Sequence, residues 1–195
     1  MDTPPPYSVP KEFVSLPAMA ELLASEQKKL NGPGIHDDWR SLRDQSQKPL
    51  REAWHAYMFG TCYAHFHEIP YGGMFMKPEA EEYSFRDATL MWGTPGEVRQ
   101  MNLQLKELPP EHRNAKVQLE HILYGVSRKY HAAYDLVVAI FLNREQRIET
   151  VPTPPLEIAE LWLFGFMDSG LTKIFLKGMT RAGHVSHVVP WKLTS

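Results

Sequence analysis

Apolar positions recur at helical spacing along the first third of this chain. Between residues 15 and 30, Met19, Leu22 and Leu23 fall on one stripe, and the turn-forming sequence at 31–34 follows. Between 49 and 68, apolar residues follow the i, i+4, i+7, i+8 pattern: Leu50, Trp54, Tyr57 and Met58. The pattern therefore predicts one helix over 15–30 and another over 49–68.

The middle of the chain contains one segment that could be extended and one sequence that is typical of the start of a helix. Residues 83–92 have no helical period and could include a short extended segment. The sequence Thr94-Pro95-Gly96-Glu97 fits a capping box, with proline at the first helical position. With the apolar residues Met101, Leu105 and Leu108 after it, this predicts a helix that ends at the two prolines 109–110, before a new start at Glu111.

The strongest helical pattern runs over residues 114–142. A near-heptad stripe continues for about eight turns, and its last third, 136–142, is apolar on all sides. A final helical region is expected from Thr153-Pro154-Pro155 through Ile158, Trp162 and Phe166, with a break at 168–170.

Both ends of the chain lack a helical period. Residues 1–10 hold four prolines, and residues 181–195 combine histidine, valine, proline and tryptophan. We expect two extended arms whose Tyr7 and Trp191 anchor in pockets of partner chains. The predicted fold is mostly α: an irregular multi-helix domain over 1–195, with extended proline-rich N- and C-terminal arms.

Composition and charge narrow the function classes. The chain has 195 residues, 43% of them hydrophobic, and a net charge of -2 without clusters of Lys or Arg, which argues against a nucleic-acid partner. The lone cysteine, Cys62, allows no internal disulfide, and the first residues lack the pattern of a signal peptide or presequence, so we expect an intracellular protein. The most apolar stretch, Ile158 to Leu176, contains Glu160, Asp168 and Lys173, which disfavours a membrane span but not peripheral contact.

Few residues of the sequence are spaced as catalysis or metal binding would require. His55, His65 and His67 share the helix predicted over 49–68, but ligands for one metal ion on a helix need i, i+3 or i, i+4 spacing. Cys62 matches no cysteine-hydrolase signature, and neither glycine-containing turn has the context of a phosphate loop. The aromatic residues of the last region are expected in a core or interface more often than in a ligand pocket: Trp162, Phe164, Phe166 and Phe175. We therefore predict no catalytic, cofactor-binding or metal-binding residues.

One stretch resembles a known family. It begins at Leu16-Pro17, continues through Ser25-Glu26-Gln27-Lys28-Lys29-Leu30 and Trp39-Arg40-Ser41-Leu42, and ends in a helix with Leu50, Trp54, Tyr57 and Phe59. This region resembles the matrix-side N-terminal part of subunit four of mitochondrial cytochrome c oxidase. Leu42, Leu50 and Phe59 agree with the family pattern when counted without gaps from Trp39. The family has a membrane-spanning helix directly afterwards, whereas residues 72–95 here are polar.

The resemblance implies a non-catalytic accessory subunit of a respiratory-chain complex, most specifically cytochrome c oxidase (complex IV). Such a subunit would lie on the matrix side of the mitochondrial inner membrane, bind other protein subunits and support assembly and stability without a cofactor of its own. The alternative is a small helical metal-dependent enzyme or ligand-binding protein that uses the helix with His55, His65 and His67.

Overall fold

The structure is a computed structural model that describes residues 12–31, 48–78, 86–94, 96–146, 148 and 155–191. Of these residues, 41% lie in eight strands and 34% in four α-helices, so the prediction of a mostly α fold is wrong. The strands are hydrogen-bonded in sequence order as one mixed sheet. The predicted N-terminal arm, with Tyr7, and the Trp39–Leu42 motif lie outside the described residues.

The chain divides into two compact units, 1–100 and 101–195, and the boundary falls within one long strand, β4 (Glu97–Leu108).

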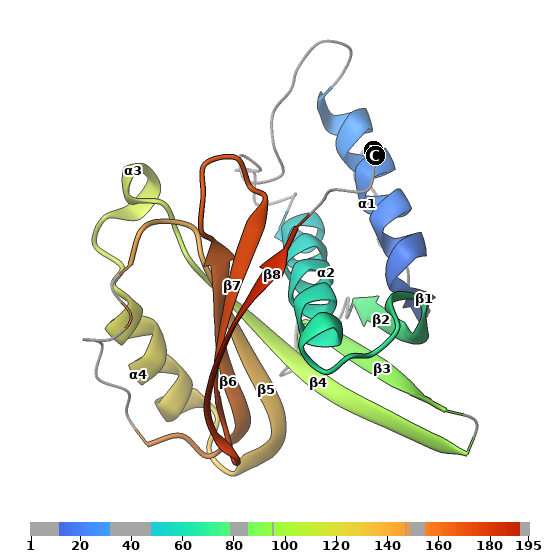
Figure 1. Cartoon of the computed structure of the whole chain (residues 1–195). Coiled ribbons are helices and arrows are strands. Elements are labelled where there is room, and N and C mark those ends of the chain that lie inside the picture. The colour runs from blue at the N-terminus through green and yellow to red at the C-terminus, as the bar shows by residue number, and fades with distance from the viewer. Residues whose placement is uncertain are drawn as a thin grey trace, which may run out of the picture. The chain divides into compact units, whose positions relative to one another are not determined.

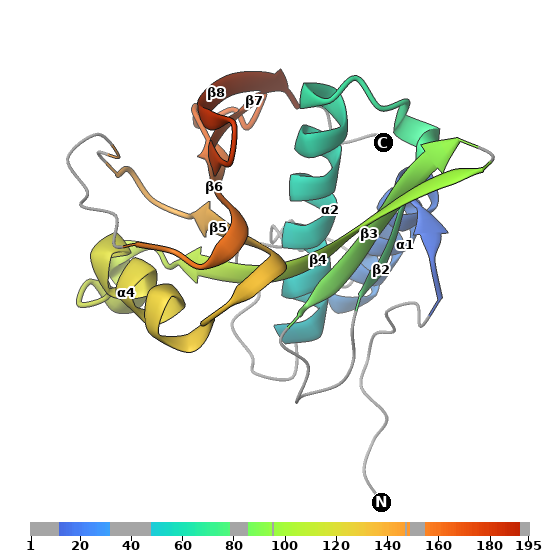
Figure 2. The same cartoon turned by 90° about the horizontal axis from the view of Figure 1, so that it is seen from below.

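Unit 1 contains the two helices that the apolar stripes predict. α1 (Leu16–Asn31) and α2 (Lys48–Phe66) contact each other, and both contact β2 (Met74–Pro78) (Figure 1). The short strand β1 (Val14–Ser15) and β3 (Ala88–Thr94) pair with β2 in antiparallel register (Figure 2). A Cβ added at Gly60 of α2 would lie 3.4 Å from both Leu16 and Leu90, so the absent side chain lets the helix approach its neighbours.

Unit 2 places one helix against a five-stranded sheet. α3 (Glu111–Asn114) and α4 (Leu119–Lys129) connect β4 to β5 (Ala133–Leu142) as a parallel crossover, and β6 (Ile158–Phe166) is parallel to β5. β7 (Lys173–Thr180) and β8 (Gly183–Pro190) complete the sheet as an antiparallel hairpin. Leu119, Leu123 and Val126 of α4 pack on a core that includes Val138 and Leu161.

Three predicted helical regions are strands for physical reasons. The helix predicted over 114–142 stops at α4, because Ala132 adopts a positive φ of 52° and its N–H is accepted by Glu157, 3.0 Å away. The apolar run that follows is buried as a parallel strand between two neighbours. The region after Ile158 forms β6 and β7. Thr94 ends β3 and Glu97 begins β4, so the apparent capping box leads into a strand instead of a helix.

The predicted C-terminal arm is a strand of unit 2. Residues 183–190 form β8, and Trp191 is 5% exposed, with its ring 6.4 Å from that of Phe166. The Trp191 N–H donates to the Thr172 carbonyl at 2.7 Å. This tryptophan therefore contacts its own unit, contrary to the expectation that it docks in a partner chain.

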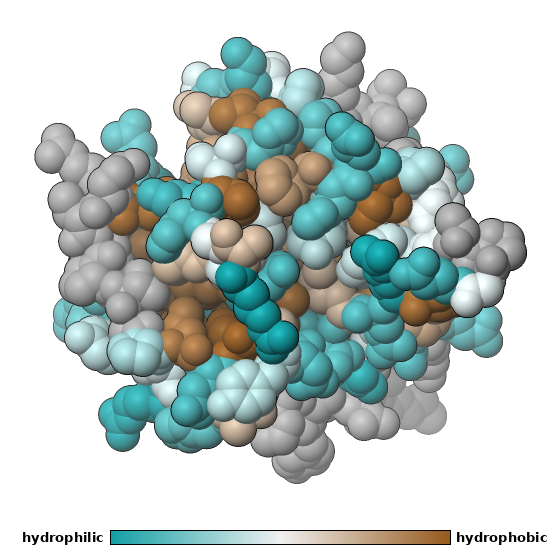
Figure 3. All heavy atoms as spheres, turned by 60° about the horizontal axis from the view of Figure 1, so that its bottom comes forward, coloured by the Kyte–Doolittle hydropathy of each residue, from teal (hydrophilic) through white to brown (hydrophobic). Residues whose placement is uncertain are grey.

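Hydrophobic side chains on the surface are distributed over several elements. The view in Figure 3 shows them as separate patches between hydrophilic residues. The large ones that are exposed among the described residues are Phe13, Phe75, Val98, Tyr124, Tyr134, Met167 and Val188. No helix within the described ranges has the length and apolar character that spanning a membrane requires.

Candidate ligand pocket

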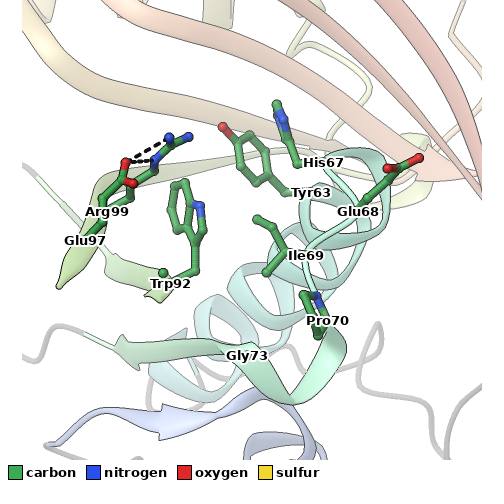
Figure 4. A pocket seen from close by; sticks show the side chains of 10 residues that line it. Tyr63, His67, Glu68, Ile69, Pro70, Gly73, Trp92, Glu97 and Arg99 are labelled. Carbon is green, nitrogen blue, oxygen red and sulfur yellow. Dashed lines mark hydrogen bonds and ion pairs between the residues drawn. The ribbon is translucent and has the colours of Figure 1, made fainter. Parts of the chain in front are cut away.

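A pocket of about 450 Å³ lies within unit 1 (Figure 4). Its lining comes from the end of α2, the segment that follows it, the end of β3 and the start of β4. These residues are Tyr63, His67, Glu68, Ile69, Pro70, Gly73, Trp92, Gly93, Glu97 and Arg99. The volume falls in the usual range of small-molecule sites.

One side of the pocket is built by the way α2 ends. The Ile69 N–H donates to the Ala64 carbonyl at 2.8 Å, and the Glu68 N–H donates to the His65 carbonyl at 3.3 Å. These two hydrogen bonds form a Schellman motif, in which the residue at the left-handed position is usually glycine. Here it is Glu68, with φ of 55°, which costs roughly 1 kcal/mol or more. The motif turns the chain so that Ile69 and Pro70 line the pocket.

The opposite side is built by the turn between β3 and β4. Gly93 has φ of 150°, and a Cβ there would lie 2.0 Å from the Glu97 carbonyl oxygen, so only glycine fits. This close approach brings Glu97 and Arg99 of β4 into the same lining as Trp92 of β3.

The walls are aromatic. The Tyr63 ring centroid lies 5.7 Å from that of Trp92 and 4.2 Å from that of His67, with the rings tilted in both pairs. Tyr63 is 6% exposed, whereas Trp92 is half-buried and His67 is exposed. A buried tyrosine at the back and a more accessible tryptophan give a wall against which a flat ligand can pack.

The charged residues are Glu68, Glu97 and Arg99. Nε and Nη2 of Arg99 donate to the same oxygen of Glu97, Oε1, at 3.2 and 3.0 Å. In Figure 4 the pair lies beside Trp92, and Glu68 lies at the other end of the pocket. The site thus combines an apolar floor and aromatic walls with one guanidinium at its edge.

Comparison with known proteins identifies no relative. No protein-family model matches the chain, and no curated protein or solved structure is detectably similar to it.

The structure does not gather the three candidate histidines, of which His55 and His65 lie in α2 and His67 follows its end. His55 is 3% exposed, whereas His65 and His67 are exposed near the end of the helix, and of the three only His67 lines the pocket. Within the ranges that the structure describes, no group of three His, Cys, Asp or Glu side chains is placed to hold a metal ion. The metal-enzyme alternative gains no geometric support from these residues.

Cys62 is fully buried, and the loss of hydration raises the pKa of its thiol far above the usual range. Because the thiolate is the reactive form, this cysteine is unsuited to act as a nucleophile.

The aromatic residues near Trp162 belong to unit 2. Trp162 and Phe164 are fully buried, and the rings of Phe141 and Phe164 are 5.4 Å apart. Their role as core residues agrees with the more frequent outcome expected for such a cluster.

Sequence reasoning misses Trp92, Glu97 and Arg99 as site residues. The sequence pattern assigns them to an extended segment and to a helix start, which would not place them together. The glycines at 93 and 96, both at positive φ, are the available signal for a hairpin turn.

Proposed function

We propose that this chain is a non-catalytic binding protein and that the pocket of unit 1 holds a small organic ligand or a side chain of a partner. The observation that carries the proposal is the lining itself. Apolar surface from Ile69 and Pro70 and aromatic walls from Tyr63 and Trp92 surround a volume of ligand size, and charged side chains lie at its two ends.

Binding is favoured over catalysis because the pocket offers recognition without an activated nucleophile. Cys62 does not line the pocket, and burial raises the pKa of its thiol. An aromatic wall with one charged group fixes the orientation of a ligand.

The proposal is tested with a fragment library screened against the full chain by ligand-detected NMR. Hits are then measured against Trp92→Leu, which removes part of the wall, and against Tyr124→Leu, which removes an aromatic side chain that is 53% exposed on α4. We expect hits whose binding is lost in Trp92→Leu and retained in Tyr124→Leu. A screen without hits, or hits that bind both variants equally, overturns the proposal.

We propose as a second candidate function that this chain is an accessory subunit of cytochrome c oxidase. This proposal is supported by α1 and α2, which lie where the resemblance to subunit four of cytochrome c oxidase places helices. The eight-stranded sheet is not part of that expectation. A binding protein without chemistry of its own is compatible with a subunit that stabilises a larger complex.

A tagged copy expressed in its native host tests the second proposal. If the chain is a subunit, it should migrate with complex IV in native gels of mild detergent extracts, and its deletion should lower the amount of assembled complex. Migration as a free protein, with complex IV unchanged after deletion, contradicts it.

A further inference from the structure

We infer that the pocket of unit 1 selects an organic anion: a flat apolar body that packs on Trp92, carrying a carboxylate that binds Arg99. The inference rests on the proposed binding function and specifies the ligand class.

Arg99 has N–H donors that Glu97 does not use. A guanidinium presents five N–H donors in a fixed plane, and here Nε and Nη2 serve a single oxygen of Glu97. No acceptor for Nη1 occurs among the described residues. A second carboxylate can therefore bind the same guanidinium through donors that Glu97 does not use.

The existing ion pair is easily replaced or shared. The side chains of Arg99 and Glu97 are 64% and 68% exposed, and solvent screening leaves such a surface pair little net stabilisation. A ligand held by the aromatic wall gains a preformed position beside Arg99, so its carboxylate competes well with that of Glu97.

Charge placement argues against a cation. Glu97 is the carboxylate on the Arg99 side of the pocket, and it is already paired with that cation. Glu68 carries the other negative charge, but Figure 4 shows it at the far end from Arg99 and Trp92. A cation packed on Trp92 would lie beside the guanidinium and beside a carboxylate that is already paired, whereas an anion can use the donors that Glu97 leaves.

Three probes of nearly equal shape test the inference: indole-3-acetate, indole-3-acetamide and tryptamine, titrated into the full chain and followed through the Trp92 indole N–H signal. The acetate should bind at least about tenfold more tightly than the amide, because charge-assisted hydrogen bonds are the stronger class. Arg99→Gln should reduce the affinity for the acetate to that for the amide. Glu97→Gln should tighten acetate binding, since it removes the competing carboxylate. Both positions are exposed, and melting curves of the variants check that they remain folded.

The outcomes separate this inference from the proposed function. If the amide binds as tightly as the acetate, or if tryptamine binds best and is weakened by Glu97→Gln but not by Arg99→Gln, the anion assignment is wrong while the pocket remains a binding site. If no probe shifts the Trp92 signal, the anion assignment fails, and the fragment screen decides the fate of the binding function separately.

Discussion

Gly178 of β7 lies directly opposite Trp162 of β6, and the indole ring occupies the space that a side chain at Gly178 would need. A Cβ at this position would lie 2.5 Å from Cζ3 of the ring. The ring is fully buried, and its Nε1 donates to Glu160 at 2.7 Å, which holds it in place. The absent side chain of Gly178 therefore gives Trp162, the largest fully buried side chain of unit 2, its position across the strand pair.

Gly178→Ala is expected to destabilise the protein by about 1–3 kcal/mol, because the added methyl group overpacks a ring that cannot move freely. Gly125→Ala is the matched control. Gly125 lies within α4, and nothing lies within 4 Å of a Cβ added there, so alanine should stabilise by roughly 0.5–1 kcal/mol. Urea unfolding of both variants measures the difference. Equal stability of the two variants would show that the indole does not restrict position 178.

The sequence predicts the helices of unit 1 better than the strands of unit 2, for a physical reason. In α1 the apolar stripe agrees with the buried residues Leu16, Met19 and Leu23. α2 is buried without a break from Ala53 to Gly60, but the stripe of larger apolar residues around it still has the helical period. In β5 every residue from Leu136 to Leu142 is buried, and such a continuous run carries no period that distinguishes strand from helix. The alternation of Met101, Leu103 and Leu105 in β4 is a strand signal, but the apparent capping box before it favours a helix.

The pocket could not be predicted from the sequence because its residues meet through turns with unusual backbone angles. Glu68 adopts a left-handed conformation although it is not glycine. The start of α4 illustrates the same difficulty: its capping box uses Gln118 and His121, a pair outside the common Ser/Thr and Glu/Gln signature. By contrast, the short extended segment expected within 83–92 is confirmed in part by β3.

Replacing Glu68 by glycine should stabilise unit 1. The left-handed backbone at this position costs a residue with a Cβ roughly 1 kcal/mol, and glycine avoids most of that cost. Glu68→Ala retains the backbone cost and removes only the carboxylate, so it should leave stability nearly unchanged. Thermal unfolding should therefore rank Glu68→Gly above the wild type and Glu68→Ala. If Glu68→Gly has a melting temperature equal to or below that of Glu68→Ala, the proposed backbone strain at Glu68 is contradicted.

Cys62 should resist alkylation in the native protein. Burial raises the pKa of its thiol and excludes the reagent, so iodoacetamide at pH 8 should modify it only when the chain unfolds. A thiol placed at exposed Ser186 in a Cys62→Ala background provides the control for reagent activity. Mass spectrometry follows both reactions. Labelling of Cys62 in buffer at the rate of the control would show that it is accessible.

Ionisation of the Glu52 carboxyl group should lower the stability of the protein as pH rises. Partial burial and the nearby charge of Asp87 raise the pKa of Glu52 above its ordinary value of 4.5, while Lys48, 3.5 Å away, lowers it in part. The folded state therefore binds the proton more tightly than the unfolded state, and stability is lost as pH rises from 4.5 through the raised pKa.

Glu52→Gln removes this ionisation. The melting temperature of the variant minus that of the wild type should therefore increase from pH 4 to pH 8. Glu21→Gln, at an exposed position of α1, is the control and should show little change with pH. A constant difference between Glu52→Gln and the wild type across this range would rule out the proposed linkage.

Asp168 should stabilise the turn between β6 and β7 in the opposite pH direction. Its Oδ2 accepts from the Thr172 hydroxyl at 2.7 Å, and its Oδ1 accepts from the Thr172 N–H at 2.9 Å. These hydrogen bonds, the side-chain one first, lower the pKa of Asp168 below its ordinary value of 3.8. Because the pKa is depressed in the folded state, the stabilisation is present above pH 3.8 and is lost as pH falls through the folded value.

Two substitutions separate the charge of Asp168 from its hydrogen bonds. Asp168→Asn keeps an oxygen acceptor for Thr172 but has no titratable group, so it should melt somewhat below the wild type at pH 7 and approach it at pH 3. Asp168→Ala removes both acceptors and should melt lowest at pH 7, because the turn also holds Leu171 at a positive φ of 54° that the hydrogen bonds help to maintain. Melting curves from pH 2.5 to 7 give the comparison. If the wild type and Asp168→Asn differ by the same amount at both ends of this range, the carboxylate charge contributes nothing to the turn, and its hydrogen bonds to Thr172 are worth no more than those of an amide.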